Sequence, residues 1–407
     1  MSRQPSFSAK LAWSLPWLVR YPLWRANEIV RRMTDNSSPR HLIFIVANHF
    51  EPAWDGTPAG LDHDVQLKRV DKWYEEARRI GNTIRDCEGT PFRHTNFYPA
   101  EQYYKPLVER LAAMQAEGLG EVEIHLHHGV DRPDNAANLR RVLEEFRDIL
   151  AEDHKCLSRR EGSDQPMYAF VHGNWALANS ARGEYCGVDS EMQILAQTGC
   201  YADFTLPSIH SPAQVARFNA IYQCGKPLSM RAPHRTGPDL KVGDDVTLPI
   251  LITGPLVFDW HHQRQGLPVP RMDDGVLGES YPLDLARLHN WQSAGISVRG
   301  RPEWTFIKLY CHGFFGFDQA STIGDPMRRF MESVLELSDK SGSFKVHFAT
   351  AREAFNLAMA AIDGHKGEPG QYRDYQLQQI MQKAIHPSTA RRGEQALQVK
   401  VGRNLTA

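Results

Sequence analysis

The chain has 407 residues and an almost balanced charge, with 47 lysines and arginines against 48 aspartates and glutamates. Hydrophobic residues make up 42% and charged residues 23% of the chain, which is typical of a globular protein and excludes a disordered tail or a coiled coil. The balanced charge gives no reason to expect nonspecific nucleic-acid binding. The six cysteines are scattered without a Cys-x-x-Cys pair, so a reducing, cytoplasmic location fits better than a secreted disulfide scaffold.

The first stretch of the chain, residues 1–39, is a basic and aromatic segment. Six arginines and lysines in residues 1–33 surround a stretch that holds three tryptophans. No apolar run in the chain reaches the ~18–20 residues of a membrane-spanning helix. Prolines interrupt this stretch and no Ala-x-Ala site follows it, which argues against a cleaved signal peptide. Two interpretations stay open: peripheral contact of residues 1–33 with an anionic inner membrane surface, or a segment that packs on the protein itself or frays.

Strands and helices alternate over residues 40–361. The apolar, β-branched run over residues 41–47 predicts a strand buried on both faces. Further strands are expected at residues 93–98, 121–126, 167–171, 202–205, 249–253, 305–310 and 345–348. Helices are expected at residues 64–85, 101–117, 135–154, 190–197, 212–222, 282–292, 327–338 and 351–361. This alternation is typical of a parallel sheet with crossover helices, and seven or eight strands in one run favour a barrel over two open sheets.

Two stretches inside the predicted barrel, residues 225–248 and 262–280, are rich in Gly, Pro and charge. They predict long loops, which at a barrel rim often carry function. Residues 362–407 are polar and predict a C-terminal tail with a helix at residues 372–385. We therefore expect three parts: the N-terminal segment, a (β/α) barrel over residues 40–361, and this tail.

Histidines and carboxylates follow the predicted strands, at the end where α/β barrels carry their chemistry. In an extended strand with its period of two, His49 and Glu51 point the same way. His125 and His127 also share a face, and His128 opens the next loop. Buried imidazoles need partners, and imidazoles with a carboxylate suit a divalent ion such as zinc. The predicted metal ligands are His49, His125, His127 and His128; the alternative is a polar rim that binds sugar hydroxyls without metal.

Other residues at these strand ends are candidates for acid–base chemistry and for substrate binding. Glu51 is a candidate metal ligand or general base, and Asp203 is a second candidate base. His312 stands where a general acid would reach the site from the opposite side. Aromatic faces beside polar groups suit pyranose rings. The candidate substrate-binding residues are Trp54, His172, Asn174, Trp175, Asp259 and Trp260.

Taken in order, several segments resemble the motifs of polysaccharide deacetylases in the glycoside hydrolase/deacetylase superfamily. These segments are residues 46–51, 96–98, 123–128, 170–174, 309–312 and 344–353, so the resemblance spans residues 40–360. Three features depart from the family pattern. His49 and Glu51 stand where the family has an Asp-Asp pair, the histidines follow an H-x-H-H spacing, and the middle motif lacks its Arg and Pro. The Asn-His-Phe-Glu-Pro string also looks like the opening motif of retaining α-glucan hydrolases.

The resemblance implies an α/β fold of the distorted seven-stranded (β/α) barrel type. It also implies a metal-dependent hydrolase that removes acetyl groups from a carbohydrate in polysaccharide metabolism or biosynthesis, with zinc as the expected divalent cofactor. Two alternatives remain open. One is a metal-independent glycosidase or transglycosidase that uses a carboxylate pair drawn from Glu51, Asp203 and Asp259. The other is a non-catalytic barrel that binds saccharide or acts as a scaffold.

Overall fold

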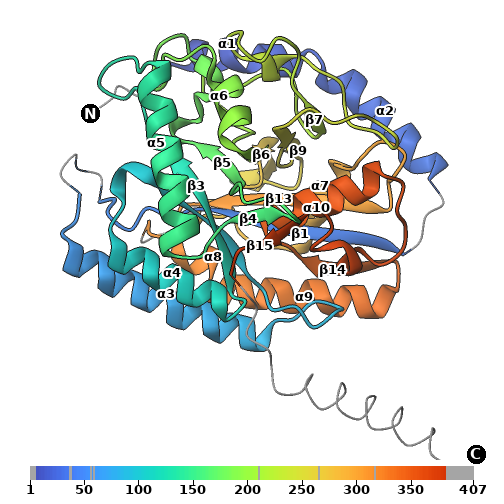
Figure 1. Ribbon diagram of the computed structural model, residues 1–407. Coiled ribbons are helices and arrows are strands. Elements are labelled where there is room, and N and C mark those ends of the chain that lie inside the picture. Colours follow the sequence, from blue (N-terminus) through green and yellow to red (C-terminus); the bar gives the residue numbers. More distant parts are fainter. Residues whose placement is uncertain are drawn as a thin grey trace, which may run out of the picture.

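The computed structural model describes residues 6–35, 39–55, 57, 60–209, 211–264, 266–315 and 318–381. The fold is mixed α/β with a central, mostly parallel sheet (Figure 1). The helices are α1 (Phe7–Leu18), α2 (Tyr21–Thr34), α3 (His63–Thr83), α4 (Lys105–Ala116), α5 (Ala136–Asp148), α6 (Glu191–Thr198), α7 (Leu285–Ser293), α8 (Gln319–Thr322), α9 (Asp325–Ser341) and α10 (Ala351–Ile362). The strands are β1 (Arg40–His49), β2 (His94–Pro99), β3 (Gly120–Leu126), β4 (Ser158–Arg160), β5 (Tyr168–His172), β6 (Cys200–Asp203), β7 (Ile221–Gln223), β8 (Ile250–Ile252), β9 (Val257–Asp259), β10 (Gln263–Arg264), β11 (Leu267–Pro268), β12 (Arg271–Asp273), β13 (Trp304–Cys311), β14 (Phe344–Phe348) and β15 (Leu377–Gln379).

Nine strands form the central sheet, in the order β13-β1-β2-β3-β5-β6-β8-β7, with β14 paired to β1 beside this path. All of these pairs are parallel except β7 with β8. The predicted α/β architecture with a parallel sheet is thus confirmed. The closed seven-stranded barrel is not found, because no ladder among the described residues joins β7 at one end of the order to β13 at the other.

Helix α10 occupies the space inside the bend of the sheet. Every residue of α10 is buried, and the helix contacts β1, β5 and β6. Because β2 and β3 lie between β1 and β5 in the sheet, one helix can touch all three only if the sheet curves around it. The alanine-rich sequence of α10 suits this place, since small side chains let the helix backbone lie close to the strands.

Strand β1 is apolar on both faces, as its sequence predicts. Ile43 and Ile45 belong to one buried cluster, and Phe44 and Val46 to another on the opposite face. Period-two alternation explains this division, because successive side chains of a strand point to opposite sides. The parallel neighbours β13 and β2 then bring their carboxyl ends to the same edge as the end of β1.

Two predicted helices are not formed. Residues 212–222 form turns that lead into β7, because the Gln214 side chain bonds the Ser208 N–H at 2.7 Å and the Val215 carbonyl at 2.7 Å. Such side-chain bonds compete with helical backbone bonds. Within the predicted helix 372–385, β15 pairs with β4 instead, and residues 382–385 lie outside the described part of the chain.

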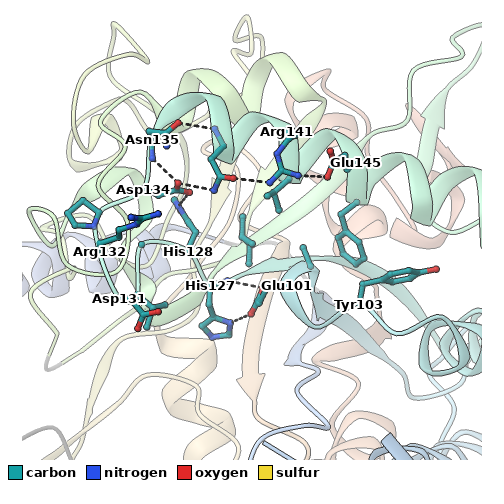
Figure 2. A pocket seen from close by; sticks show the side chains of 18 of the residues that line it. Glu101, Tyr103, His127, His128, Asp131, Arg132, Asp134, Asn135, Arg141 and Glu145 are labelled. Carbon is teal, nitrogen blue, oxygen red and sulfur yellow. Dashed lines mark hydrogen bonds and ion pairs between the residues drawn. The ribbon is translucent and has the colours of Figure 1, made fainter. Parts of the chain in front are cut away.

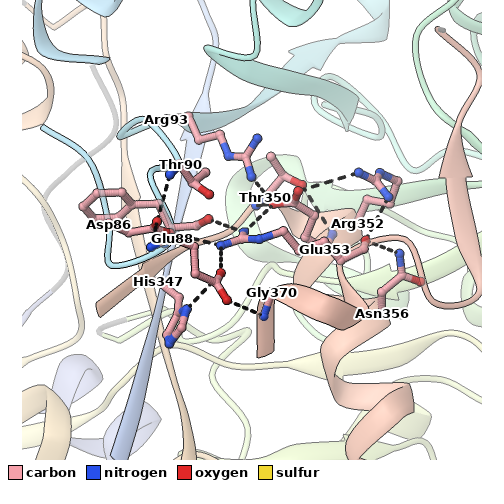
Figure 3. Close-up of polar contacts among 12 residues, drawn as sticks. Asp86, Glu88, Thr90, Arg93, His347, Thr350, Arg352, Glu353, Asn356 and Gly370 are labelled. Carbon is pink, nitrogen blue, oxygen red and sulfur yellow. Dashed lines mark hydrogen bonds and ion pairs between the residues drawn. The ribbon is translucent and has the colours of Figure 1, made fainter. Parts of the chain in front are cut away.

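The chain after α10 packs on the body up to residue 381, and a partly buried network of charges fixes it there (Figure 3). The Arg373 guanidinium lies 3.0 Å from Asp86, 3.0 Å from Glu88 and 3.3 Å from Glu353. Glu353 also accepts from Arg93 at 2.5 Å. Charges taken out of water need such partners, so this network links the C-terminal segment to two distant parts of the chain.

Helices α1 and α2 pack one face against the body of the protein. Trp17 is buried and its ring contacts Phe218 and Phe258, with centroids 5.9 and 6.1 Å away. Arg32 donates to the Gln292 carbonyl at 2.7 Å. The interpretation that the segment packs on the protein itself therefore holds for this face. Within the described residues, no helix combines the length and the apolar character that a bilayer crossing requires.

Candidate active site

Side chains from three strand ends and one following loop meet at one edge of the sheet. His49 ends β1, His125 lies near the end of β3, and His312 follows β13. The His49 ring centroid lies 4.8 Å from that of His125 and 4.5 Å from that of His312. Glu51 comes from the loop directly after β1. His49, Glu51 and His125 each offer one ligand atom within 4.8 Å of the others, and we call them the His49 cluster.

The Glu51 carboxylate is the centre of this group. Its Oε1 atom lies 3.2 Å from His125 Nε2 and 3.1 Å from His127 Nε2. Burial alone raises the pKa of Glu51, but the hydrogen bonds of His125 and His127 outweigh it and hold the pKa well below its usual value. Glu51 is therefore a carboxylate at neutral pH, and a weak base.

The hydrogen bonding of His125 leaves its Nε2 atom for a cation. Its Nδ1 atom lies 2.8 Å from the Val171 carbonyl oxygen, which can only accept, so Nδ1 carries the proton. Nε2 therefore faces the Glu51 carboxylate, where a proton on Nε2 bonds to the carboxylate and a divalent ion that replaces this proton would use the Nε2 lone pair. Burial, followed by the neighbouring His312 and His125, lowers the pKa of His49 well below its usual value, so His49 is also neutral. Two imidazoles and a carboxylate fit a zinc-like divalent ion.

His127 does not fit the predicted role of a metal ligand. Its Nδ1 atom lies 2.7 Å from Glu101 Oε1, and its Nε2 faces Glu51. Burial opposes a charge on this ring, but the bonds to Glu101 and Glu51 raise its pKa to about 10. A protonated imidazole has no lone pair to give a metal. His127 therefore holds Glu51 in place as an ion-pair partner.

His128 and His172 belong to a second group, apart from the His49 cluster. His128 was predicted as a metal ligand beside His125, and His172 as a substrate-binding residue. Instead their Nε2 atoms face each other at 3.0 Å, and both lie against Cys186 and Glu191. The reason is the chain direction after β3, which turns His128 away from His125 toward the end of β5.

An aromatic surface adjoins His312. The His312 ring stacks on Phe315 with centroids 4.7 Å apart and an interplanar angle of 6°. The ring centroid of Trp54 lies 4.1 Å from that of Phe315, and the ring centroid of Trp175 lies 6.5 Å from that of His312. Burial lowers the pKa of His312, so the ring is neutral at pH 7 and can accept a proton. Trp54 thus lies beside Phe315 and Trp175 beside His312, and their role in substrate binding stays a prediction.

Three other predicted residues, Asp203, Asp259 and Trp260, contact residues outside the His49 cluster. Asp203 accepts from the Thr205 hydroxyl at 2.7 Å, and burial raises the pKa of Asp203 to about 7. Asp259 accepts from Arg271 at 3.1 Å, and Trp260 next to it is 65% exposed. No hydrogen bond among the described residues joins Glu51, Asp203 or Asp259 to another of the three. The glycosidase alternative stays a prediction, because its two carboxylates need to stand ~5–9.5 Å apart rather than in contact.

Asn174 lies in the tight turn after β5, next to Trp175. Both residues have left-handed backbone angles, with φ of 54° and 58°. The Asn174 side chain is half-buried. Gly173 before it allows close packing, because a Cβ there would lie 2.3 Å from His127 Cδ2. This turn therefore sets how near the β5 end approaches His127.

A cavity of about 990 Å³ opens beside this edge of the sheet, between the segment after β3 and helix α5 (Figure 2). His127 and Glu101 line it, together with Asp131, Arg132 and Arg141. Its size is at the upper end of the ~300–1,000 Å³ of small-molecule sites. The mixture of carboxylates and guanidinium groups favours a polar ligand.

Sequence reasoning missed three residues of these sites: Glu101, Cys186 and Glu191. Glu101 follows β2, so the rule of strand ends could have found it. Cys186 lies in an irregular segment and Glu191 begins α6, and neither position has a periodic signal.

No protein-family model matches the chain, and no curated protein matches it. A crystal structure of a "putative polysaccharide deacetylase" from Mycobacterium smegmatis resembles it with a TM-score of 0.40 and 13% sequence identity. The similarity covers 80% of this chain and 93% of that chain. At this degree of similarity, we take the function from the site residues alone.

Proposed function

We propose that the chain is a metal-dependent hydrolase that removes an acetyl group from a carbohydrate. The observation that carries this proposal is the His49 cluster, in which His49, the Nε2 atom of His125 and the Glu51 carboxylate converge. These three residues would hold the ion. When bound, a divalent ion supplies Lewis-acid chemistry, polarising an acyl carbonyl and making water easier to deprotonate.

The residues around the cluster support hydrolysis of an acetyl ester or amide. His312, neutral and 4.5 Å from His49 between ring centroids, takes a proton from the attacking water. It then returns this proton to the sugar oxygen or nitrogen as the bond to the acetyl carbon breaks, which leaves acetate and a free hydroxyl or amine. Glu51 acts as a ligand, because the low pKa makes it a poor base. His127 is a positioning residue, since it acts through Glu51.

Carbohydrate is the substrate class that the surroundings favour. Trp54 is 43% exposed and lies against Phe315, which in turn stacks on His312. An exposed aromatic face beside polar edges suits a pyranose ring, which has a C–H face and hydroxyl edges. The polar cavity beside His127 would accept further sugar units of a chain.

Acetate release and metal content test the proposal together. The purified chain is incubated with N-acetylated and O-acetylated oligosaccharides, with and without added zinc, cobalt or nickel, and metal is measured by mass spectrometry. We expect metal-dependent acetate release that His125→Ala abolishes and His289→Ala, at an exposed helical position, leaves unchanged. A folded chain that binds no metal and releases no acetate would overturn the proposal. Release of reducing sugar without acetate would point to the glycosidase alternative, and sugar binding alone to the non-catalytic barrel.

We further propose that the outer face of α1 and α2 binds an anionic membrane surface. Seven large apolar side chains there are 45–79% exposed: Leu11, Leu15, Val19, Leu23, Ile29, Val30 and Met33. The only acidic residue of these helices, Glu28, is buried and paired with Arg31 at 2.8 Å. Lys10 and the exposed Arg20 are sequence neighbours of the exposed Leu11 and Val19. An apolar face with a basic border and no exposed acid fits anionic lipid headgroups.

Sedimentation with lipid vesicles tests this surface. The chain should pellet with vesicles that contain phosphatidylglycerol, and less with vesicles of phosphatidylcholine alone. Leu15→Asp combined with Leu23→Asp should abolish binding, whereas Leu267→Asp, a control on an exposed leucine elsewhere, should not. Equal pelleting of the double variant, or a wild-type chain that forms dimers through this face and ignores vesicles, would contradict the proposal.

A further inference from the structure

A second group of metal-binding side chains lies apart from the His49 cluster. His128 follows β3, His172 ends β5, and Glu191 begins α6. Cys186 comes from the irregular segment between β5 and α6. All four side chains are buried, and one ligand atom from each lies within 4.8 Å of the other three. We call these residues the Cys186 cluster.

The hydrogen bonds around the two histidines point their lone pairs at each other. His172 Nδ1 contacts the Gly173 carbonyl oxygen, which can only accept. His128 Nδ1 lies 3.0 Å from the Asp134 carboxylate, so it is a donor too. In the neutral rings both Nε2 atoms are then acceptors. The two Nε2 atoms lie 3.0 Å apart, and Glu191 Oε1 lies 3.0 Å from His128 Nε2.

Three acceptors in a buried space repel one another unless a cation lies between them. A metal ion and an extra proton on His128 are the two ways to supply that charge. Burial opposes the proton, although Glu191 and Asp134 raise the pKa of His128 well above its usual value. Cys186, the fourth member of the cluster, favours the metal ion over the proton, because two imidazoles can share a proton without a thiol beside them.

The Cys186 side chain completes a set of four ligands. Its Sγ atom lies 3.5 Å from Glu191 Oε2, and His172 Nε2 lies 3.5 Å from the same oxygen. Tetrahedral zinc with bonds of ~2.0–2.3 Å separates its ligands by roughly 3.3–3.6 Å. The two 3.5 Å contacts match this separation and the two 3.0 Å contacts of His128 are shorter, so an ion requires the His128 ring to move outward.

The supporting residues are also of the kind found around metal ligands. Asp134 orients His128, and it is itself bonded by the Asn135 N–H at 2.8 Å and the Asn138 amide at 2.9 Å. The Ala178 N–H donates to Glu191 at 2.5 Å. His128 and Asp134 also line the large cavity, which gives an ion a path to the cluster (Figure 2).

The segment held by the cluster has an unusual backbone that needs such support. Six of its non-glycine residues, Asn174, Trp175, Ala178, Asn179, Arg182 and Tyr185, have positive φ angles between 49° and 60°. Each such angle costs free energy that the surroundings must offset. Ligands at both ends of this segment, His172 and Cys186, would fix it and the Trp175 ring within it.

We propose that a structural zinc ion binds to His128, His172, Cys186 and Glu191 and fixes both ends of the segment between β5 and α6. Binding deprotonates the Cys186 thiol, and its proton passes to solvent. The four side chains would fill all four coordination positions of the ion, as in structural zinc sites. The His49 cluster has three ligands and would leave one coordination position open. The proposal does not depend on the deacetylase function, since it concerns other residues and another readout.

Zinc content in a variant that lacks the first site provides the test. In the His49→Ala chain we expect one tightly bound zinc per molecule, which Cys186→Ser removes and Cys200→Ser, a buried cysteine outside the cluster, retains. Cobalt in place of zinc should give a thiolate-to-cobalt charge-transfer band that depends on Cys186 in the same way. If His49→Ala does not fold, Glu51→Gln serves as the background.

Limited proteolysis gives an independent readout of whether zinc fixes the segment between β5 and α6. Chelation of zinc, or Cys186→Ser, should expose the segment between residues 173 and 190 to cleavage while the circular dichroism of the fold persists. A folded His49→Ala chain without bound zinc and without the cobalt band would overturn the proposal, and would mean that the cluster holds only a proton. A wild-type chain that holds zinc in the Cys186 cluster but releases no acetate would instead count against the proposed function alone.

Discussion

His125 Nε2 lies 3.2 Å from Glu51 Oε1, although the Nδ1 atom of the same ring already donates to the Val171 carbonyl. The ring is thus oriented with Nε2 toward the carboxylate. A cation, either a proton on Nε2 or a metal ion between the two atoms, joins this pair. This relationship is the reason to expect a metal ion at the end of β1 and β3.

The first prediction concerns that ring. His125→Ala removes a ligand and leaves Glu51 with His127 as its one remaining imidazole partner. We expect the loss of the ion from the His49 cluster and a decrease in acetate release of more than ~100-fold, since changes even behind a ligand cost ~10–100-fold. Metal analysis and acetate assays check it, with His289→Ala as the matched control. Activity within a few-fold of wild type would contradict it.

The second prediction concerns the pH dependence of stability through His127. Burial opposes its charge, but Glu101 and Glu51 raise its pKa to about 10 in the folded chain, above the ordinary ~6.5 of an unfolded histidine. The stabilisation is therefore fully present below about pH 6.5 and is lost as the pH rises through about 10. Urea unfolding at several pH values should show a fall in the free energy of unfolding over this window. His127→Gln should reduce that fall, and an identical slope in both chains would refute the assignment.

The third prediction concerns substrate stacking. Trp54→Ala should raise KM by ~3- to 10-fold with little change in kcat, because an aromatic contact contributes about 0.5–1.5 kcal/mol. Trp260→Ala provides the control, since that exposed ring lies at the end of β9 near Phe258, with centroids 6.0 Å apart. Steady-state kinetics on an acetylated oligosaccharide measures both. Equal effects of the two variants would argue against a sugar site at Trp54.

The fourth prediction concerns the charge network of the C-terminal segment. Arg373→Ala leaves Asp86 and Glu353 with fewer partners in a buried place, which costs about 3–5 kcal/mol of unfolding free energy. Lys340→Ala removes an exposed partner of Glu336 and should change the unfolding free energy little, because solvent screens this pair. Denaturant unfolding of both variants checks the difference. Similar losses would show that the network adds little to the stability of the fold.

Much of the fold follows from local patterns in the sequence. The run over residues 41–47 became β1 because apolar side chains on both faces can be buried only inside a parallel sheet. The bend of the sheet around α10 could not be read in this way, because the fully buried helix has the same alanine-rich pattern as a helix on the outside of a barrel. The predicted helix 212–222 was wrong because the Gln214 amide bonds the nearby backbone, which periodicity does not register.

Only part of the candidate site could be predicted, because the sequence shows which residues end strands but not which loops meet. Strand-end position identified His49, Glu51, His125 and His312, and the structure brings them together. It could not show that His127 pairs with Glu101 or that His128 turns away from His125, because these contacts depend on Glu101 and on the Cys186 cluster. Those partners come from other loops, and one sequence gives no distance between loops.

The most direct test of the metal-dependent site is a crystal structure of the zinc-loaded chain, with anomalous diffraction measured on both sides of the zinc absorption edge. The account predicts an anomalous peak bound by His49, Glu51 and His125. A fully loaded, active crystal with no peak between these three side chains would contradict it.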